Sequence, residues 1–445
     1  MGSFLVRPAA FVKGKLSFLG DKSIAHRCII CSSLSTGKTV IKNFPANKDC
    51  LYTLKGLKKL GVKVIQGKEK DKNLLRLTVF GKGLYGLKKP KSPIFVGESG
   101  TTLRLMLGVL AGQDFQVKIL AARSLSQRPM LRVATPLRMM GAQICAVRKK
   151  SPDGKIDEYP PVTVRGGNLN SIDYSMPVAS AQVKSAILLA GLYARGITRV
   201  REPISTRDHT ERILKLFKAG IKTKENQILI KGRGRLVSPG SIYVPGDISS
   251  AGFFMVLASI LPGSEILMKN VSLNPSRSGI IRVLNKMGAD IRELSRSHSA
   301  EPMGDLLVKS SRLKGITVKK ELIPSLIDEI PILMVAGCFA RGKTVFEGAQ
   351  ELRVKETDRI NSMSQNLIKM GARIRVSASR GSEKIVIDGV KQLKGTRVKS
   401  FGDHRTAMSM VVAGMAATGK TYIDDIACVN KSFPNFLSLV GSLKR

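Results

Sequence analysis

One segment combines cations and a carboxylate at a spacing that suits proton transfer beside an anion. Residues Arg353 to Arg359 read Arg-Val-Lys-Glu-Thr-Asp-Arg. On a helix, Lys355 and Arg359 would lie four residues apart on one face, with Glu356 next to them. A carboxylate among cations can exchange a proton with a bound anionic substrate. A salt-bridged helix in solvent is the more common explanation of such a segment. The choice between a reactive site and such a helix therefore depends on the other segments.

The segment before the first apolar helix has the residues of an anion site. Lys22, Ser23 and Arg27 come just before or at the start of a helix that runs to Leu34. Ser23 is a candidate N-cap, and the backbone amides at a helix start favour a bound anion. An ordinary capped helix with solvated charges explains the segment equally well.

Two turns could contribute to such a site. Gly100 lets a ligand approach the backbone closely, and Thr101 and Thr102 are candidate caps for the next helix. Arg128 presents a planar fork that suits a carboxylate or a phosphate, and Pro129 restricts its backbone. An ordinary turn and a surface arginine are the competing interpretations.

The last such segment reads Gly402-Asp403-His404-Arg405 and precedes a helix rich in Ala, Met and Val. Asp403 is a candidate N-cap, and Arg405 projects beside it. His404 has no partner at metal-ligand spacing, so we expect a structural histidine.

The chain repeats one pattern six times, which indicates how these segments are positioned. In each repeat an amphipathic helix ends in glycine before a strand, at Gly61, Gly141, Gly220, Gly288, Gly371 and, more weakly, Gly441. An apolar helix alternates with it and ends before a β-branched strand, at Gly37, Gly112, Gly196, Gly263, Gly342 and Gly419. Units that bury helix faces against a sheet predict an α/β protein of six similar units, three in each of two domains.

The repeats explain two sequences that match the phosphate-binding P-loop. Residues 337–344 and 414–421 fit the pattern, but a P-loop leaves a strand and opens a helix. Here the order is reversed, because 330–340 is an expected helix and 344–346 an expected strand. Residues 81–86 match a dinucleotide-binding pattern, but lysines and a proline follow instead of an apolar helix. We therefore expect neither ATP nor a dinucleotide.

Composition excludes several classes of protein. The chain has 445 residues, 43% of them hydrophobic, without an apolar run of the roughly 18 residues that a membrane helix needs. Met1 to Lys15 lack the pattern of a signal peptide, so the cytoplasm is the expected location. Cys28 and Cys31 form a C-x-x-C in an apolar stretch without a second pair or a histidine cluster, so we expect no metal.

The net charge of +42 is unusual, with 74 lysines and arginines against 32 acidic residues. Such an excess suggests a nucleic-acid-binding protein. The basic residues are spread along the whole chain, however, and aromatic residues make up only 5% with no tryptophan, so stacking platforms are scarce. We expect no dedicated nucleic-acid partner. Salt-dependent binding of RNA or duplex DNA, together with missing enzyme activity, would favour that alternative.

In their order along the chain, these segments resemble the EPSP synthase family from Lys15 to Leu437. The resemblance adds Ser180-Ala181-Gln182 and Lys431-Ser432-Phe433-Pro434 to the segments above. It implies the two-domain inside-out α/β barrel of the enolpyruvyl transferases. Residues 1–19 plus 243–445 would form the first domain and residues 20–242 the second, with the active site in the cleft between them.

The same resemblance implies a reaction and its ligands, without a cofactor or metal. The enolpyruvyl group of phosphoenolpyruvate would move to the 5-hydroxyl of shikimate 3-phosphate by addition and elimination, on the pathway to aromatic amino acids. Phosphoenolpyruvate would be held by Lys22, Gly100, Arg128, Gln182, Arg359, Arg405 and Lys431. Shikimate 3-phosphate would be held by Lys22, Ser23, Arg27, Ser180, Gln182, Asp328 and Lys355.

The resemblance also assigns proton transfers. Asp328 would accept the proton of the 5-hydroxyl, and Glu356 would donate a proton to the methylene group, with Lys22 as a rival for part of this work. The expected enzyme has two small-molecule substrates and no membrane partner, and it is expected to be a monomer. Markers such as Gly20-Asp21-Lys22 and Asn270–Arg277 are similar to those of the second class of the family. Its response to glyphosate stays open.

The nearest alternative is the sister enzyme that transfers enolpyruvate to UDP-N-acetylglucosamine. That enzyme shares the fold and usually carries a reactive cysteine in the loop corresponding to residues 122–129. This chain has no cysteine there, and Lys22-Ser23 stands where the sister enzyme has lysine and asparagine.

Overall fold

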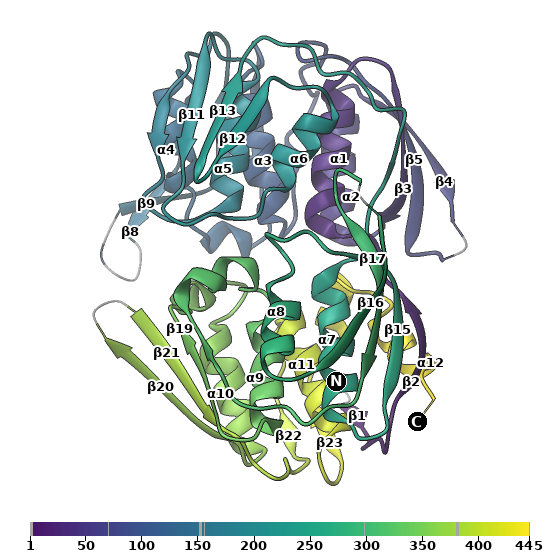
Figure 1. Ribbon diagram of the computed structural model, residues 1–445. Coiled ribbons are helices and arrows are strands. Elements are labelled where there is room, and N and C mark those ends of the chain that lie inside the picture. Colours follow the sequence, from purple (N-terminus) through teal and green to yellow (C-terminus); the bar gives the residue numbers. More distant parts are fainter. Residues whose placement is uncertain are drawn as a thin grey trace. The chain divides into compact units, whose positions relative to one another are not determined.

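The computed structural model describes residues 3–69, 71–150, 154, 156–297, 299–379 and 382–444. The chain divides into two compact units (Figure 1). Gly20–Val244 is here called the central unit, and Met1–Leu19 with Pro245–Arg445 is called the terminal unit. Each unit has a hydrophobic core of its own.

The described residues of the central unit form three four-stranded sheets that share one topology. In each sheet a short edge strand is parallel to the second strand, and the other pairs are antiparallel. In spatial order the sheets are β14 (Ser241–Tyr243), β3 (Lys38–Pro45), β5 (Leu74–Phe80), β4 (Lys63–Lys68); then β6 (Ile94–Phe95), β7 (Gln116–Leu120), β9 (Ile156–Arg165), β8 (Gln143–Lys150); and β10 (Asp173–Ser175), β11 (Ile197–Arg201), β13 (Gln227–Lys231), β12 (Ile221–Lys224).

The terminal unit repeats this topology twice and shortens it once. Its strands are β2 (Lys13–Ser17), β15 (Glu265–Ser272), β17 (Met303–Lys309), β16 (Asp290–Ser297); then β18 (Thr317–Val318), β19 (Lys343–Glu347), β21 (Ser382–Asp388), β20 (Arg373–Ser379); and β22 (Arg397–Val398), β23 (Thr421–Ile423), β1 (Phe4–Val6). The last sheet has three strands. The N-terminal strands therefore complete sheets whose other strands come from the second half of the chain.

Buried and amphipathic helices alternate along each unit, as the repeated pattern predicted. The buried helices are α1 (Lys22–Leu34), α3 (Gly100–Leu110) and α5 (Ala181–Gly191) in the central unit, and α7 (Ile248–Ile260), α9 (Ile330–Phe339) and α11 (His404–Met415) in the terminal unit. The amphipathic helices are α2 (Lys48–Lys59), α4 (Leu131–Met139), α6 (His209–Leu216), α8 (Gly279–Lys286), α10 (Arg359–Lys369) and α12 (Phe436–Ser442). Short 3-10 helices are η1 (Leu125–Gln127), η2 (Lys320–Ser325), η3 (Gln350–Val354) and η4 (Ala427–Lys431).

The buried helices lie in the middle of each unit, and the sheets lie around them (Figure 1). In the terminal unit α7, α9 and α11 contact one another pairwise, and in the central unit α3 packs on α5. Outer strands such as β16 expose most of their residues. This inside-out α/β arrangement confirms the predicted fold, and it gathers the N-termini of three buried helices in each unit.

Of the six amphipathic helices, α2, α4, α8 and α10 are followed by a left-handed glycine as predicted, and α6 and α12 are not. Gly61 after α2 has φ +85°, a left-handed conformation that other residues resist. After α6 that conformation belongs to Lys218, with φ +61°, so the predicted cap at Gly220 is wrong. Gly441 lies inside α12 instead of after it, so that prediction is also wrong.

The order of elements at the two P-loop-like sequences is confirmed. Helix α9 ends at Phe339 before β19 starts at Lys343, and α11 ends at Met415 before β23 starts at Thr421. The amides at these glycines therefore do not open a helix.

Two features are absent from the described residues. Within the described ranges, none of the helices combines the length and the apolar content needed to span a membrane. In the same part of the chain, no three His, Cys, Asp or Glu side chains are grouped so that they could hold a metal ion.

Candidate active site

Helix α1 begins with Lys22, and its cap is Asp21. The Asp21 carboxylate accepts a hydrogen bond from the backbone of Ile24 at 3.0 Å. The prediction that Ser23 caps this helix is wrong, because aspartate is an equally good N-cap and stands earlier in the chain. Lys22 is thus the first helical residue, and its Nζ lies 2.9 Å from Asp49 Oδ2.

Helix α3 is capped by Ser99, whose Oγ accepts from the backbone of Thr102 at 3.2 Å. The prediction that Thr101 or Thr102 caps this helix is therefore wrong. The Thr102 hydroxyl instead continues a chain of hydrogen bonds, to Ser99 and to Thr53 at 2.7 Å each, and Thr53 meets Nδ1 of His26 at 2.7 Å. This chain joins α1, α2 and α3 behind their N-termini.

The buried His26 is expected to make stability depend on pH below neutrality. Burial lowers the pKa of His26 from 6.5 to about 3. Between these values the unfolded chain binds a proton that the folded chain does not, so stability is complete above pH 6.5 and falls as the pH drops toward 3. The His26 contribution should fall by about 2 kcal/mol from about pH 7 to about pH 5.

Urea unfolding of wild type and of His26→Asn at both pH values measures this contribution. The variant, which keeps a polar partner for Thr53, should lose less stability than wild type on acidification. An equal loss in the two proteins would contradict the prediction.

Gly100, Arg128 and Gln182 come together around a residue that the sequence analysis did not single out. A Cβ added at Gly100 would lie 2.8 Å from Arg104 Nη1 and 3.4 Å from Arg128 Nη1. The buried Arg104 donates to Gln182 Oε1 at 2.6 Å and to the Pro129 carbonyl at 3.3 Å. Arg104 thus holds together three segments that carry predicted phosphoenolpyruvate ligands, and a glycine at position 100 leaves room for it.

Arg27 lies in α1, the first buried helix of the central unit, and Ser180 directly precedes α5, the third. Arg27 donates to Thr210 at 2.6 Å, to Ser185 at 2.7 Å and to the Ser23 carbonyl at 2.8 Å. Ser180 caps α5 by accepting from the backbone of Val183 at 3.4 Å. Arg27 therefore ties α1 to α5 and α6, and it contacts the backbone of Ser23, another predicted ligand of shikimate 3-phosphate.

A buried cluster of charges lies at the N-terminal part of α5, which contains Lys184. Lys184 Nζ lies 2.7 Å from Glu211 and 2.9 Å from Glu202, and all three side chains are buried. Burial opposes the charge on Lys184, but Glu211 and Glu202 outweigh it and raise the pKa of the lysine. Burial also raises the pKa of Glu211, against the effect of Lys184. One cation therefore holds two carboxylates in place.

Lys184→Met is expected to destabilise the chain by about 3–5 kcal/mol, because two buried carboxylates lose their cation. Urea unfolding measures the loss. The triple variant with Glu202→Gln and Glu211→Gln removes the buried charges as well and should recover much of it. A single variant as stable as wild type would show that the cluster contributes nothing to folding.

In the terminal unit, residues 353–359 do not form one helix. Helix η3 ends at Val354, and α10 starts at Arg359 after Asp358, which accepts from the backbone of Asn361 at 3.0 Å. The prediction that Lys355 and Arg359 share a helical face is therefore wrong. Asp358 acts as an N-cap and is held by Arg353 at 2.6 Å, so the chain bends before it. The bend leaves Glu356 on a loop that reaches back to Arg359.

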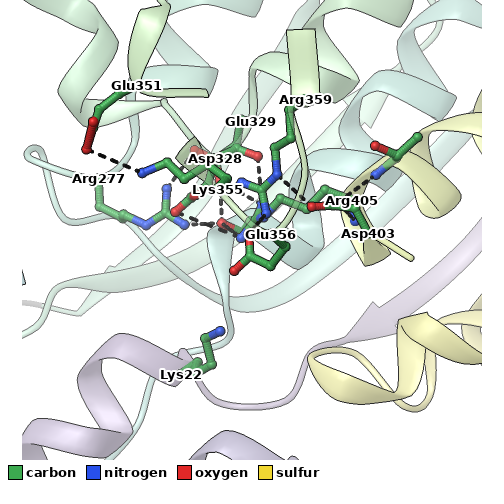
Figure 2. Close-up of polar contacts among 12 residues, drawn as sticks. Lys22, Arg277, Asp328, Glu329, Glu351, Lys355, Glu356, Arg359, Asp403 and Arg405 are labelled. Carbon is green, nitrogen blue, oxygen red and sulfur yellow. Dashed lines mark hydrogen bonds and ion pairs between the residues drawn. The ribbon is translucent and has the colours of Figure 1, made fainter. Parts of the chain in front are cut away.

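Arg359 is a buried hub for three carboxylates (Figure 2). It contacts Asp403 at 2.9 Å and Glu356 at 2.5 Å, and Asp328 at 3.4 Å. Burial opposes its charge, but these carboxylates outweigh burial and raise its pKa. The arrangement brings together the predicted base Asp328, the predicted acid Glu356 and a predicted phosphoenolpyruvate ligand.

Helix α11 supplies the second arginine of this group. Asp403 caps the helix by accepting from the backbone of Arg405 at 2.7 Å and of Thr406 at 3.1 Å, which confirms the predicted cap. Burial opposes ionisation of Asp403, but Arg359 outweighs it and holds its pKa below the usual value. Arg405 donates to the Asp328 carbonyl at 2.8 Å, and its Nη2 lies 3.9 Å from Asp328 Oδ2.

His404 lies between these residues in the sequence but is buried as a neutral side chain. Burial lowers its pKa to about 4, against the effect of Asp403. In the part of the chain that the structure describes, its Nε2 has no hydrogen-bond partner. These observations support the prediction of a structural histidine.

Two further predicted ligands, Lys355 and Lys431, belong to the terminal unit. Lys355 Nζ lies 4.0 Å from Glu351, and burial lowers its pKa although Glu351 and Asp328 oppose this. Lys431 is the last residue of η4, which packs against α11. Sequence reasoning missed Arg104 as part of the site, although it lies in the helix that begins at Gly100.

The family model and the relatives that match this chain carry the same enzyme name. The family model described as EPSP synthase (3-phosphoshikimate 1-carboxyvinyltransferase) matches residues 6–439. A 3-phosphoshikimate 1-carboxyvinyltransferase from Geotalea daltonii is 46% identical over 435 residues, 98% of this chain and 97% of the relative. One from Bacillus cytotoxicus is 44% identical over 440 residues, 98% of this chain and 99% of the relative.

A solved structure extends the likeness to the fold. The EPSP synthase from Acinetobacter baumannii matches with a TM-score of 0.85 and 40% identity, over 100% of both chains. Since both the family model and these relatives cover nearly the whole length, this chain belongs to the EPSP synthase (3-phosphoshikimate 1-carboxyvinyltransferase) family.

Proposed function

We propose that this chain transfers the enolpyruvyl group of phosphoenolpyruvate to the 5-hydroxyl of shikimate 3-phosphate, on the route to aromatic amino acids. One observation carries the proposal: Arg359 meets Asp328, Glu356 and Asp403, and Arg405 lies against Asp328. Two arginines for an anion and two carboxylates for protons thus occupy one place. In a chain of this family, that place is where phosphoenolpyruvate would react.

The ligands proposed for the two substrates divide between the units. The central unit carries Lys22, Ser23, Arg27, Gly100, Arg128, Ser180 and Gln182, and the terminal unit carries Asp328, Lys355, Glu356, Arg359, Arg405 and Lys431. Because the substrates are anions, guanidinium and ammonium groups with helix N-termini supply the attraction, without a metal or a cofactor.

The reaction is an addition followed by an elimination. Glu356 gives a proton to the methylene carbon of phosphoenolpyruvate, the 5-hydroxyl oxygen bonds to the adjacent carbon, and Asp328 takes the hydroxyl proton. The intermediate then loses phosphate, which takes the proton held by Asp328, and a proton returns from the methyl group to Glu356, so that the double bond is restored. Arg359 and Arg405 stabilise the negative charge of the phosphoenolpyruvate part throughout. Lys22 is the rival of Glu356 for part of the proton transfer.

Phosphate release from phosphoenolpyruvate, measured with and without shikimate 3-phosphate, tests this function. Release that depends on shikimate 3-phosphate supports it. Release that depends on UDP-N-acetylglucosamine would assign the chain to the sister reaction. No release with either acceptor would remove the enolpyruvyl-transfer proposal.

A further inference from the structure

A buried ion pair lies directly behind the proposed arginine and base. The Glu329 carboxylate is 0% exposed, and its Oε2 accepts from Arg277 Nη1 at 2.6 Å. Its Oε1 accepts from the hydroxyl of Ser249. A charge buried to this degree is stable only when it is paired and hydrogen-bonded. Neither Glu329 nor Arg277 has a role in the reaction described above.

The Ser249 hydroxyl links this pair to Arg405. It donates to Glu329 and accepts from Arg277 and, at 3.3 Å, from Arg405 Nη2. A hydroxyl has one hydrogen to donate and two lone pairs to accept with, so these three contacts use it fully. Ser249 stands in the first turn of α7, Glu329 directly before α9, and Arg405 in the first turn of α11. The network therefore holds the N-termini of the three buried helices of the terminal unit together.

The charges of the network decide what Arg405 can bind. Glu329 Oε1 lies only 3.6 Å from Arg405 Nη1, close enough to act as its counter-ion. Arg277 lies closer to Glu329, at 2.6 Å, and neutralises it. Arg405 therefore keeps its positive charge for a substrate anion. Since Arg405 also donates to the Asp328 carbonyl at 2.8 Å, its position and that of the proposed base are coupled.

We propose that Arg277, Glu329 and Ser249 are positioning residues that set the direction and the charge of Arg405 and the backbone of Asp328. Figure 2 shows Arg277, Glu329, Asp328 and Arg405 in one group. The proposal rests on the proposed function, because Arg405 and Asp328 have their roles only there. Its core is an exchange of partners: without Arg277, Glu329 takes Arg405 as its counter-ion.

Arg277→Met tests this exchange through the Michaelis constants of the two substrates. KM for phosphoenolpyruvate should rise by about tenfold or more, the size of a lost charge-assisted contact, because Arg405 turns toward Glu329. KM for shikimate 3-phosphate should rise far less, because Asp328 alone among its proposed ligands is coupled to Arg405. A purely structural role would lower the amount of active enzyme, and so kcat, while both Michaelis constants stayed unchanged.

The double variant Arg277→Met/Glu329→Gln makes the test decisive. Removing the competing carboxylate should bring KM for phosphoenolpyruvate back toward wild type. A double variant no better than the single one would overturn the proposal. If Arg277→Met does not fold, two other variants are compared with wild type instead. The double variant buries no unpaired charge, and Arg277→Lys keeps the charge that neutralises Glu329. Both should keep KM for phosphoenolpyruvate close to the wild-type value, and a raised KM in both would overturn the proposal.

Arg138→Met is the matched control. Arg138 pairs with the buried Glu158 at 2.8 Å in the central unit, and its other hydrogen bonds among the described residues go to the Ile144 carbonyl. It should lower stability and leave KM for phosphoenolpyruvate unchanged. A wild-type protein without turnover would remove the proposed function, whereas an active wild type with an unchanged KM in Arg277→Met would overturn this inference alone.

Discussion

Asp328→Asn is expected to lower kcat by about 10²- to 10⁴-fold, the usual contribution of a general base. The amide has nearly the size of the carboxylate but cannot take the proton of the 5-hydroxyl. Phosphate release at saturating concentrations of both substrates measures the change. Turnover at the wild-type rate would remove Asp328 from the mechanism.

The same variant is expected to bind phosphoenolpyruvate at least as tightly as wild type. Arg359 and Arg405 already face Asp328, at 3.4 Å and 3.9 Å, so a substrate anion must compete with this carboxylate for them. An uncharged amide removes that competition. Calorimetric titration with phosphoenolpyruvate in the presence of shikimate 3-phosphate measures the affinity. Weaker binding would show that Asp328 holds the arginines in place instead of competing with the substrate.

A carboxylate far from the site is the control for both measurements. Asp290 pairs with Arg292 at 2.9 Å on the exposed strand β16. Asp290→Asn should leave kcat and the affinity for phosphoenolpyruvate unchanged. A loss there would show that carboxylates of the terminal unit act on turnover through general effects of charge.

The fold could be predicted from the sequence because the residue patterns that specify it are local and recur along the chain. Helix-ending glycines such as Gly61 mark the same helix-to-strand turn in successive repeats. Buried helices such as α9 are apolar on all sides. Predictions of helix ends were wrong where a neighbouring residue could cap the helix or take the left-handed conformation. Asp21 replaces Ser23 as a cap, and Lys218 takes the left-handed conformation expected of a glycine.

The site could be predicted only as a set of segments. Local patterns do not tell that Asp358 interrupts the helix expected around Arg359, because the interruption depends on the pairing of Asp358 with Arg353. Nor do they show that Arg104 reaches Gln182, 78 residues away in the chain. Packing of the folded chain decides which distant side chains meet. The spacing of residues along the sequence therefore does not reveal these pairs.

Arg359→Met is expected to be the most damaging single change in the terminal unit. The substitution leaves the fully buried Asp403 without its cation and removes the contacts of Arg359 with Glu356 and Asp328. Removing one partner of a buried ion pair costs about 3–5 kcal/mol, so the urea midpoint should fall markedly. KM for phosphoenolpyruvate should rise by about tenfold or more, because a charge-assisted contact to the substrate is lost.

The two effects can be separated by removing the stranded charge as well. Asparagine is also a good N-cap, so Arg359→Met/Asp403→Asn keeps the start of α11 and should recover much of the lost stability. KM for phosphoenolpyruvate should stay high in that double variant, because the guanidinium is still absent. Arg359→Lys, which keeps the charge without the fork, should lie between wild type and Arg359→Met in both measurements. Recovery of KM together with stability would show that Arg359 serves the fold alone, and that the substrate anion is held by other cations.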